Sequence, residues 1–277
     1  MSLSVNTNVA SLTAQNALAS SQNSLNTSLQ RLSTGLQINS AADNPAGLVT
    51  SSLQAAQISG LQQSLQNIST ATNLAQTADG SLSNINNLLV QIRTLASNSA
   101  NTGTQSASSL AANQASAAAL LTSIDSIAST TAFGKVNLLD GTFTNGQFQT
   151  GAFSGQTAGL SLSAADTTTL GVNSIDLTSA AGATAALTAI DNAISTIATD
   201  RGNIGSFVAG TLNATHANNQ SELTNLQSAQ STLTDTNYQT EIANYTSDSI
   251  RQQAASTVLG FANQSNSSIL SLLKNAG

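Results

Sequence analysis

The first 36 residues constrain the fold most, because leucines recur there with a seven-residue period. Leu18, Leu25 and Leu32 follow one another at seven-residue steps, and Leu29 and Leu36 repeat this step four positions further on. Two such series predict the a and d positions of a helical seam. A seam needs a partner helix, and apolar residues near the other chain end also have helical spacing. They are Ile242, Ile250, Ala254, Val258, Phe261, Ile269 and Leu272.

The polar face of this first segment carries amides and hydroxyls where a soluble coiled coil would carry glutamate and lysine. Such a surface offers little charge repulsion against association. Apolar periodicity also runs to within a few residues of both chain ends, although chain termini normally fray. These features predict that the two terminal helices pair and that they form an assembly seam between copies of the chain.

The composition favours an aliphatic, helical core. Of the 277 residues, 40% are hydrophobic but only 3% are aromatic, and cysteine is absent. Six basic residues against twelve acidic ones, without a Lys or Arg cluster, argue against nucleic-acid binding. The uncharged run 94–124 is rich in Ser, Asn and Gln, so no membrane insertion is expected. Residues 1–30 lack a cation and an unbroken apolar stretch, which predicts a cytosolic protein or export without a secretory signal peptide.

A helix break is expected around residues 39–48. Asp43 or Asn44 could cap a new helix there, and Pro45, the only proline, suits a first helical turn. Apolar residues then keep helical spacing over residues 61–96, which predicts a long second helix. A third helix is expected over residues 110–127, and the short link predicts that it folds back antiparallel on the second.

The period changes in the next segment, which is rich in Gly and Thr. Asn145-Gly146 lies between two phenylalanines, and alternating apolar residues follow at 160–164, which predicts short β-hairpins. From about Thr184 to Leu233 helical spacing returns and predicts one long return helix.

These elements predict a mainly α fold. The expected architecture is a long antiparallel helical hairpin or coiled-coil bundle, with paired N- and C-terminal helices and a small β-hairpin tip at its far end. Residues 1–44 and 234–277 are expected to form a terminal coiled-coil domain. Residues 45–180 and 181–233 are expected to form a helical-bundle domain that includes the β-rich tip at about 133–178.

The sequence offers little material for catalysis or cofactor binding. His216 is the only histidine, and it lies inside the predicted return helix. One histidine without cysteine cannot supply the three or four ligands of a usual zinc site, and the carboxylates are scattered. We therefore expect no catalytic, metal or cofactor residues, with a Ser/His hydrolase using His216 as a remote alternative.

Several sequence blocks resemble bacterial flagellin, the subunit of the flagellar filament. The resemblance covers most of the chain except about residues 142–180. The N-terminal blocks are NTNVASLTAQNAL from Asn6, SLQRLSTGLQINSAADNPAGL from Ser28, QIRTLASNSANT from Gln91 and FGKVNLLDG from Phe133. The C-terminal blocks are TDTNYQTEIAN from Thr234 and VLGFANQSNSSILSLL from Val258.

The resemblance implies a non-enzymatic subunit that polymerises with itself into the extracellular filament used for motility. It implies a short form without large outer variable domains, exported unfolded through the flagellar secretion apparatus. The implied partners are that apparatus and its chaperone, and the hook–filament junction and cap proteins. Pro45 and the low charge depart from the commonest family pattern and could alter the hinge between the domains. The nearest alternative is the hook–filament junction protein, which resembles flagellin at both termini but caps a junction.

The resemblance also has an implication for binding of the chain by an animal innate immune receptor. In flagellins that Toll-like receptor five detects strongly, one segment resembles Arg-x-Arg-Glu-Leu, and an acidic residue faces it from the next helix. That acidic position aligns here with Ser116, and amides such as Asn98 and Gln114 would have to take over filament contacts of this surface. The loss of charges predicts weak recognition. The matching segment is Gln91-Ile92-Arg93-Thr94-Leu95.

Overall fold

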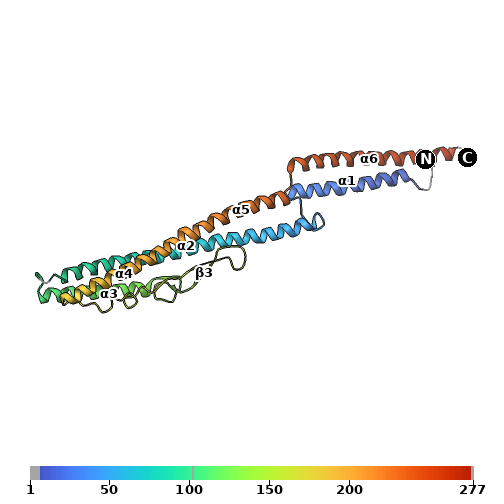
Figure 1. Ribbon diagram of the computed structural model, residues 1–277. Helices are drawn as coiled ribbons and strands as arrows, with labels where there is room; N and C mark the ends of the chain where they lie inside the picture. The colour runs from blue at the N-terminus through green and yellow to red at the C-terminus, as the bar shows by residue number, and fades with distance from the viewer. Residues whose placement is uncertain (1–6, 102, 276–277) are drawn as a thin grey trace. The chain divides into compact units, whose positions relative to one another are not determined.

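The computed structural model describes residues 7–101 and 103–275, except the side chains of 266, 267 and 269–275. The expected mainly α fold with a small antiparallel β part is confirmed (Figure 1). The helices are α1 (Val9–Thr34), α2 (Pro45–Ser99), α3 (Ala107–Thr130), α4 (Ala180–Ser206), α5 (Asn213–Thr234) and α6 (Tyr238–Asn275). The π-helix η1 (Phe207–Leu212) joins α4 to α5. The strands are β1 (Ala132–Phe133), β2 (Val136–Asn137), β3 (Gly146–Gln149) and β4 (Thr157–Leu160).

The chain divides into two units. Unit 1 contains residues 1–56 and 226–277, and unit 2 contains residues 57–225. The expected domain boundaries at 44 and 234 fall at the ends of helices, whereas the units divide inside α2 and α5. The first turns of α2 belong to unit 1 because Ile38 packs against Gly47. The end of α5 also belongs to unit 1, because Gln37 N donates to Thr234 O at 2.7 Å.

The break before α2 forms as its side chains predict. Pro45 is the first residue of α2, and Asn44 Oδ1 accepts the backbone N–H of Gly47 at 2.9 Å. This bond satisfies one of the free N–H groups at the start of the helix. Asp43 instead closes the preceding turn, where its Oδ2 accepts the backbone N–H groups of Asn39 at 3.1 Å and Ser40 at 2.8 Å. Asn44 is thus the cap of α2.

Unit 2 has the aliphatic core that the composition favours. The inward side chains of α2 recur at steps of three and four residues and pack against α3 and α4. Two ion pairs also join α2 to α4, between Arg93 and Asp191 at 2.6 Å and between Arg201 and Asp79 at 2.7 Å. The largest fully buried side chains of the three helices are Leu61, Leu82, Ile85, Leu89, Ile92, Ile124, Ile190 and Ile197.

The β segment forms, but the expectation that it is the tip of the bundle is wrong. It runs back beside the helices (Figure 1), and Asn67 of α2 donates to Gln149 O at 3.0 Å. The burial of Leu138 and Leu139 requires this position against the core. The expected turn at Asn145-Gly146 is also wrong, because β3 already pairs with β4 from Gly146 and the connection is residues 150–156.

Several aspartates hold turns of the β segment. The hydroxyl and backbone N–H of Thr142 bond to Asp140 and lower its pKa below the usual 3.8, and Thr178 acts in the same way on Asp176. Asp200 of α4 is the opposite case, because burial raises its pKa while a hydrogen bond from Ser163 opposes the rise. A lowered folded-state pKa gives stability that is present above pH 3.8 and lost as the pH falls.

Acidification should therefore change the free energy of unfolding in opposite directions through Asp140 and Asp176 on one hand and Asp200 on the other. The double variant Asp140→Asn, Asp176→Asn should lose less free energy of unfolding than the natural chain between pH 5 and pH 2.5. Asp200→Asn should lose more, because the natural Asp200 gains relative stability on protonation. Denaturant unfolding at each pH, followed by circular dichroism, measures this. Equal slopes for all three proteins would contradict it.

Candidate assembly surface

The terminal helices α1 and α6 lie side by side in unit 1 and run antiparallel (Figure 1). Near the start of α1, Asn8 Nδ2 donates to Ala262 O at 2.9 Å. At its end, Arg31 Nη1 lies 3.9 Å from Glu241 Oε2 in the first turn of α6. Both ions suit their positions, because a cation favours a helix C-terminus and an anion favours an N-terminus.

The face of α1 that is turned to α6 has a regular heptad, but half of its positions are small or polar. Leu18, Leu25 and Leu32 are half-buried at one set of seven-residue steps. The other set holds small residues, of which Ala14 and Ser28 are buried. The least exposed residues of α6 face them at the same spacing and are also largely polar. These are Glu241, Tyr245, Asp248, Gln252, Ala255, Leu259 and Ala262.

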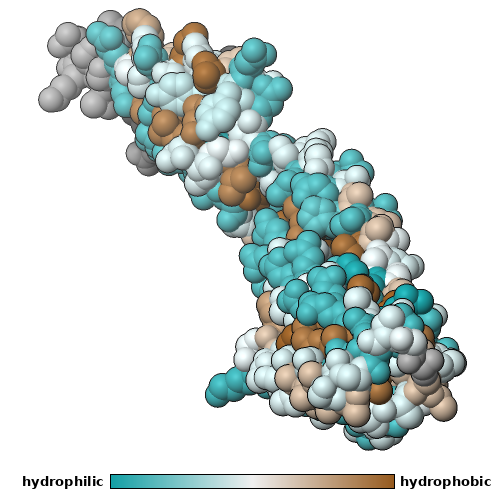
Figure 2. Space-filling view, turned by 90° about the vertical axis from the view of Figure 1, so that its left-hand side faces the viewer, coloured by the Kyte–Doolittle hydropathy of each residue, from teal (hydrophilic) through white to brown (hydrophobic). Residues whose placement is uncertain are grey.

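Several large apolar residues of α6 lie on its other side, open to solvent. Ile250 is 61% exposed and Phe261 is 67% exposed, so they make little contact with α1. Figure 2 shows such hydrophobic side chains among polar ones on the face in view. We call the exposed large residues of the two helices and their junction the outward apolar set. It consists of Val9, Leu12, Leu29, Leu36, Ile242, Ile250, Val258 and Phe261.

A shallow apolar hollow lies within this surface. Val9 of α1 and Val258 of α6 line it, and small residues of α1 complete its lining. Its volume is about 460 Å³, which is enough for a large apolar side chain. The remaining lining residues are Ala10, Thr13, Ala14 and Ala17.

The single seam predicted from the sequence therefore divides into two surfaces. Leu18, Leu25 and Leu32 face α6, but Leu29 is 45% exposed and Leu36 is 38% exposed. The prediction placed Leu25 and Leu29 together in the seam. The structure places Leu25 and Ser28 there instead, and the small serine side chain permits close approach of the two helices. Ile250, Ala254, Val258 and Phe261 are exposed, and the side chains of Ile269 and Leu272 lie outside the described residues.

Sequence reasoning missed the polar half of the inner seam. Ser21 and Ser28 are seven residues apart, and Ser11 lies seven residues before Leu18. Ser11 Oγ donates to Asn263 Oδ1 at 2.8 Å, so this polar layer also fixes the register of the two helices. The available signal was that these serines fall into the same three- and four-residue spacing as Leu18, Leu25 and Leu32.

The arginines of the chain are used inside the molecule. Each of the four arginines pairs with a carboxylate, and the fourth pair joins Arg251 to Asp248 at 3.2 Å. Within the described residues, no three His, Cys, Asp or Glu side chains gather as a metal site. His216 lies exposed on α5. None of the described helices is both long and apolar enough to cross a membrane.

The segment matched to the receptor site lies on α2. Gln91, Arg93 and Thr94 are exposed, and Leu95 is half-buried. Both guanidinium bonds of Arg93 go to Asp191, from Nε to Oδ1 at 2.6 Å and from Nη2 to Oδ2 at 3.4 Å. The arginine side chain is therefore held against α4.

Two nearby amides were expected to take over filament contacts, but both are engaged within the molecule. Gln114 donates to Ile175 O at 3.1 Å and accepts from Leu177 N at 2.6 Å. Asn98 accepts a hydrogen bond from Gln105. Gln114 thus fastens the β segment to α3, which opposes its use in a contact with another copy. Ser116, the aligned acidic position, is exposed on α3.

Comparison with known proteins matches both terminal helical regions of the chain to one family. The model of the bacterial flagellin N-terminal helical region matches residues 5–144, and the model of the C-terminal helical region matches residues 187–273. Flagellin of Bacillus subtilis (strain 168) is 31% identical, and the alignment covers 98% of this chain and 99% of that protein. The chain belongs to the bacterial flagellin family.

Further relatives support membership of this family. Flagellin of Halalkalibacterium halodurans is 32% identical over 98% of this chain and 99% of its own length. The crystal structure of Bacillus cereus flagellin is 31% identical, with a TM-score of 0.50 over 56% of this chain and 88% of that chain. This short flagellin is a structural subunit of the exported, extracellular filament, it polymerises with itself, and it is not an enzyme. Nothing in the comparisons supports a hydrolase using His216 or a junction protein.

The inner seam makes a prediction about folding. Leu25→Asp places a carboxylate against α6, where we expect no cation to reach it, and should cost roughly 2 kcal/mol or more. The helical circular dichroism of α1 and α6, of 26 and 38 residues, should fall. Unit 2 should keep its unfolding transition, because its core contains no residue of α1 or α6. An unchanged spectrum would show that Leu25 is not in the seam.

Proposed function

We propose that this flagellin polymerises through the outward apolar set of α1 and α6, with a second copy of the chain as its partner. The supporting observation is that this helix pair has a partly polar inner face and leaves large apolar side chains exposed. The buried face holds serines and Glu241, whereas Ile250, Val258 and Phe261 are more than half exposed. A surface of this kind marks an interaction site. Different patches meeting head to tail form an open helical polymer.

We infer that assembly and folding of the helix pair are coupled. Within the monomer, Leu18, Leu25 and Leu32 are only half-buried. Arg31 Nε is buried without a hydrogen-bond partner, which weakens the seam. Ile242, Ile250, Val258 and Phe261 are 53% to 67% exposed, so covering them adds roughly 3.5 to 7 kcal/mol of gross apolar burial at ~1.5 to 3 for each fully exposed side chain. The helix pair would be marginal alone and stable in the filament, and this weakness supports passage of an unfolded chain through the export apparatus.

The other partners follow from the same surface. An exported subunit with an exposed apolar stripe needs protection before assembly, which supports binding of α6 by the export chaperone. At the two ends of the filament the same stripe lacks a second copy. We propose that the hook–filament junction and cap proteins cover it there.

Two matched substitutions test the surface. Val258→Asp should abolish filament formation, because a carboxylate would be buried against a neighbouring copy without a partner. Thr257→Asp places the same charge on the adjacent exposed residue, outside the outward apolar set, and should still polymerise. Electron microscopy and sedimentation of purified protein measure polymer. Circular dichroism of the monomers should show equal helix content for both variants.

The outcomes are distinct. Filaments from Val258→Asp would refute the outward surface, and loss of polymer in both variants would show that α6 tolerates no charge in this region. Limited proteolysis adds the coupling test: α1 and α6 should be cut in monomers and resist cleavage in filaments. Equal resistance of α1 and α6 to protease in monomers and in filaments would refute the coupling of folding to assembly.

We also propose weak recognition of the monomer by Toll-like receptor five. The support is the exposed and uncharged Gln91, Thr94 and Ser116, and the pairing of Arg93 with Asp191. If each missing charge-assisted contact contributes about 1.5 to 3 kcal/mol, two of them weaken binding on the order of 10² to 10⁴-fold.

A receptor reporter assay on monomer tests this recognition. The triple variant Gln91→Arg, Thr94→Glu, Ser116→Glu should gain signal relative to the natural chain. Full potency of the natural chain would refute the proposal. A triple variant that stays inactive would show that these three positions are not the cause.

A further inference from the structure

The return helix contains one extra residue. From Ala180 to Thr234 it is continuous, but η1 is a π-helix, and the N–H of Asn213 donates to Val208 O, five residues back rather than four. Single π turns of this kind are rare and frequently lie at functional sites. Phe207 of η1 packs on Phe148 of β3, with 6.1 Å between the ring centroids.

The extra residue changes which side chains face inward. Ile190, Ile197 and Ile204 are buried at seven-residue steps in α4. The same step would next bring Thr211 and Asn218 inward, but both are exposed. Each inward position beyond η1 is shifted by one residue, and η1 therefore acts as a register adaptor. At seven-residue steps beyond it, Leu212 and Asn219 are buried and Leu226 is half-buried, and Leu223, four residues after Asn219, is also buried.

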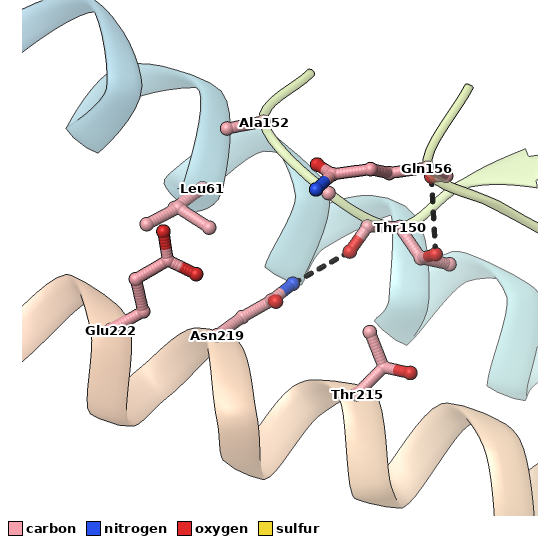
Figure 3. A pocket seen from close by; sticks show the side chains of 8 residues that line it. Leu61, Thr150, Ala152, Gln156, Thr215, Asn219 and Glu222 are labelled. Carbon is pink, nitrogen blue, oxygen red and sulfur yellow. Dashed lines mark hydrogen bonds between the residues drawn. The ribbon is translucent and has the colours of Figure 1, made fainter. Parts of the chain in front are cut away.

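The shift delivers Asn219 to a buried polar site. Asn219 is 6% exposed, and its Nδ2 donates to Thr150 O at 2.7 Å and to Ser64 Oγ of α2 at 2.8 Å. Figure 3 shows the amide pointing from α5 to the loop that joins β3 to β4. This bond joins the return helix to the start of loop 150–156.

The loop is held at further points. Gln149 Nε2 donates to Phe153 O at 2.6 Å, and Phe153 N donates to Gln156 Oε1 at 2.9 Å. Ala152 packs so closely on Gly60 of α2 that an added Cβ there would lie 3.0 Å from its own Cβ. The backbone of Phe153 is therefore fixed, although its side chain is 55% exposed.

We propose that Asn219 is a positioning residue, set in place by η1, that fixes loop 150–156 so that Phe153 contacts a second copy of the chain. Four of the six phenylalanines pack on the core of unit 2, and only Phe153 and Phe261 are exposed. Phe261 belongs to the outward apolar set, whose partner is a second copy. An aromatic on a rigid loop makes a strong contact because its ordering cost is already met. The inference rests on the proposed function.

A pair of deletions tests the register adaptor. Deleting Gly210, whose added Cβ would meet no atom within 4 Å, should convert η1 to α-helix and keep Asn219 inward. Deleting the exposed Ser195 of α4 removes a residue where no extra one exists and should misalign the core. The first variant should keep the natural thermal midpoint, and the second should lower it. Equal damage from both deletions would overturn the role of η1.

Isosteric substitutions test Asn219. Asn219→Asp removes the donor and should speed hydrogen exchange of residues 149–157, whereas Asn218→Asp puts the same charge on the exposed neighbour and should not. Asn219→Ala, without a charge, should match Asn219→Asp in exchange. Unchanged exchange in both Asn219 variants would overturn the positioning role.

Phe153→Ser tests the contact itself. It should leave monomer exchange unchanged and raise the critical concentration for polymerisation roughly tenfold or more. Phe133→Ser, at a core-packed position, should instead destabilise the monomer. An unchanged critical concentration for Phe153→Ser would refute the contact, even if Val258→Asp abolishes filaments. If Val258→Asp polymerises while Phe153→Ser does not, the proposed surface on α6 fails and the loop contact stands.

Discussion

The antiparallel pairing of α1 and α6 is the interaction on which the proposed assembly depends, and it leaves several of its large apolar side chains exposed. An ordinary helix pair buries its large aliphatic side chains and exposes its polar ones. Here the inner seam contains serines, Glu241 and the incompletely bonded Arg31, while Ile250 and Phe261 face solvent. Polar groups in a seam specify register at a cost in stability. The proposed coupling of folding to assembly is compatible with that cost, because contacts with a second copy would add to the stability of the pair.

Unit 2 follows the usual rule, and this difference separates the roles of the two units. Its aliphatic core is continuous from α2 to α4, and its β segment is fastened by side chains that bond to backbone. Gln114 and Asp125 hold two stretches of this segment against α3. The chain has only 6% charged residues, and its four arginines lie in internal ion pairs, so none of these guanidinium groups is unpaired in the monomer.

Periodicity predicted the helices well, because each presents a stripe to a partner. The start of α2 was predicted from Asn44 and Pro45, because the preference of these residues for the first turn of a helix depends only on the local backbone. Periodicity could not place the β segment, since the position of Leu138 and Leu139 depends on a core formed by distant helices. It also could not choose between Ser28 and Leu29 as seam residues. Both spacings suit a helix, and only the partner's surface decides whether a small or a large side chain is buried.

The register shift at η1 was hidden for a related reason. Ile197, Ile204, Leu212 and Leu226 read as one apolar stripe, because a mixture of three- and four-residue steps tolerates one additional residue. Asparagines occur at both 218 and 219, so residue type alone does not reveal which of them is buried. Burial decides it, and the buried one bonds to both α2 and the loop after β3. A one-residue defect in a helix thus determines how the loop carrying Phe153 is held, and this link between helix register and loop position exists only in the folded unit.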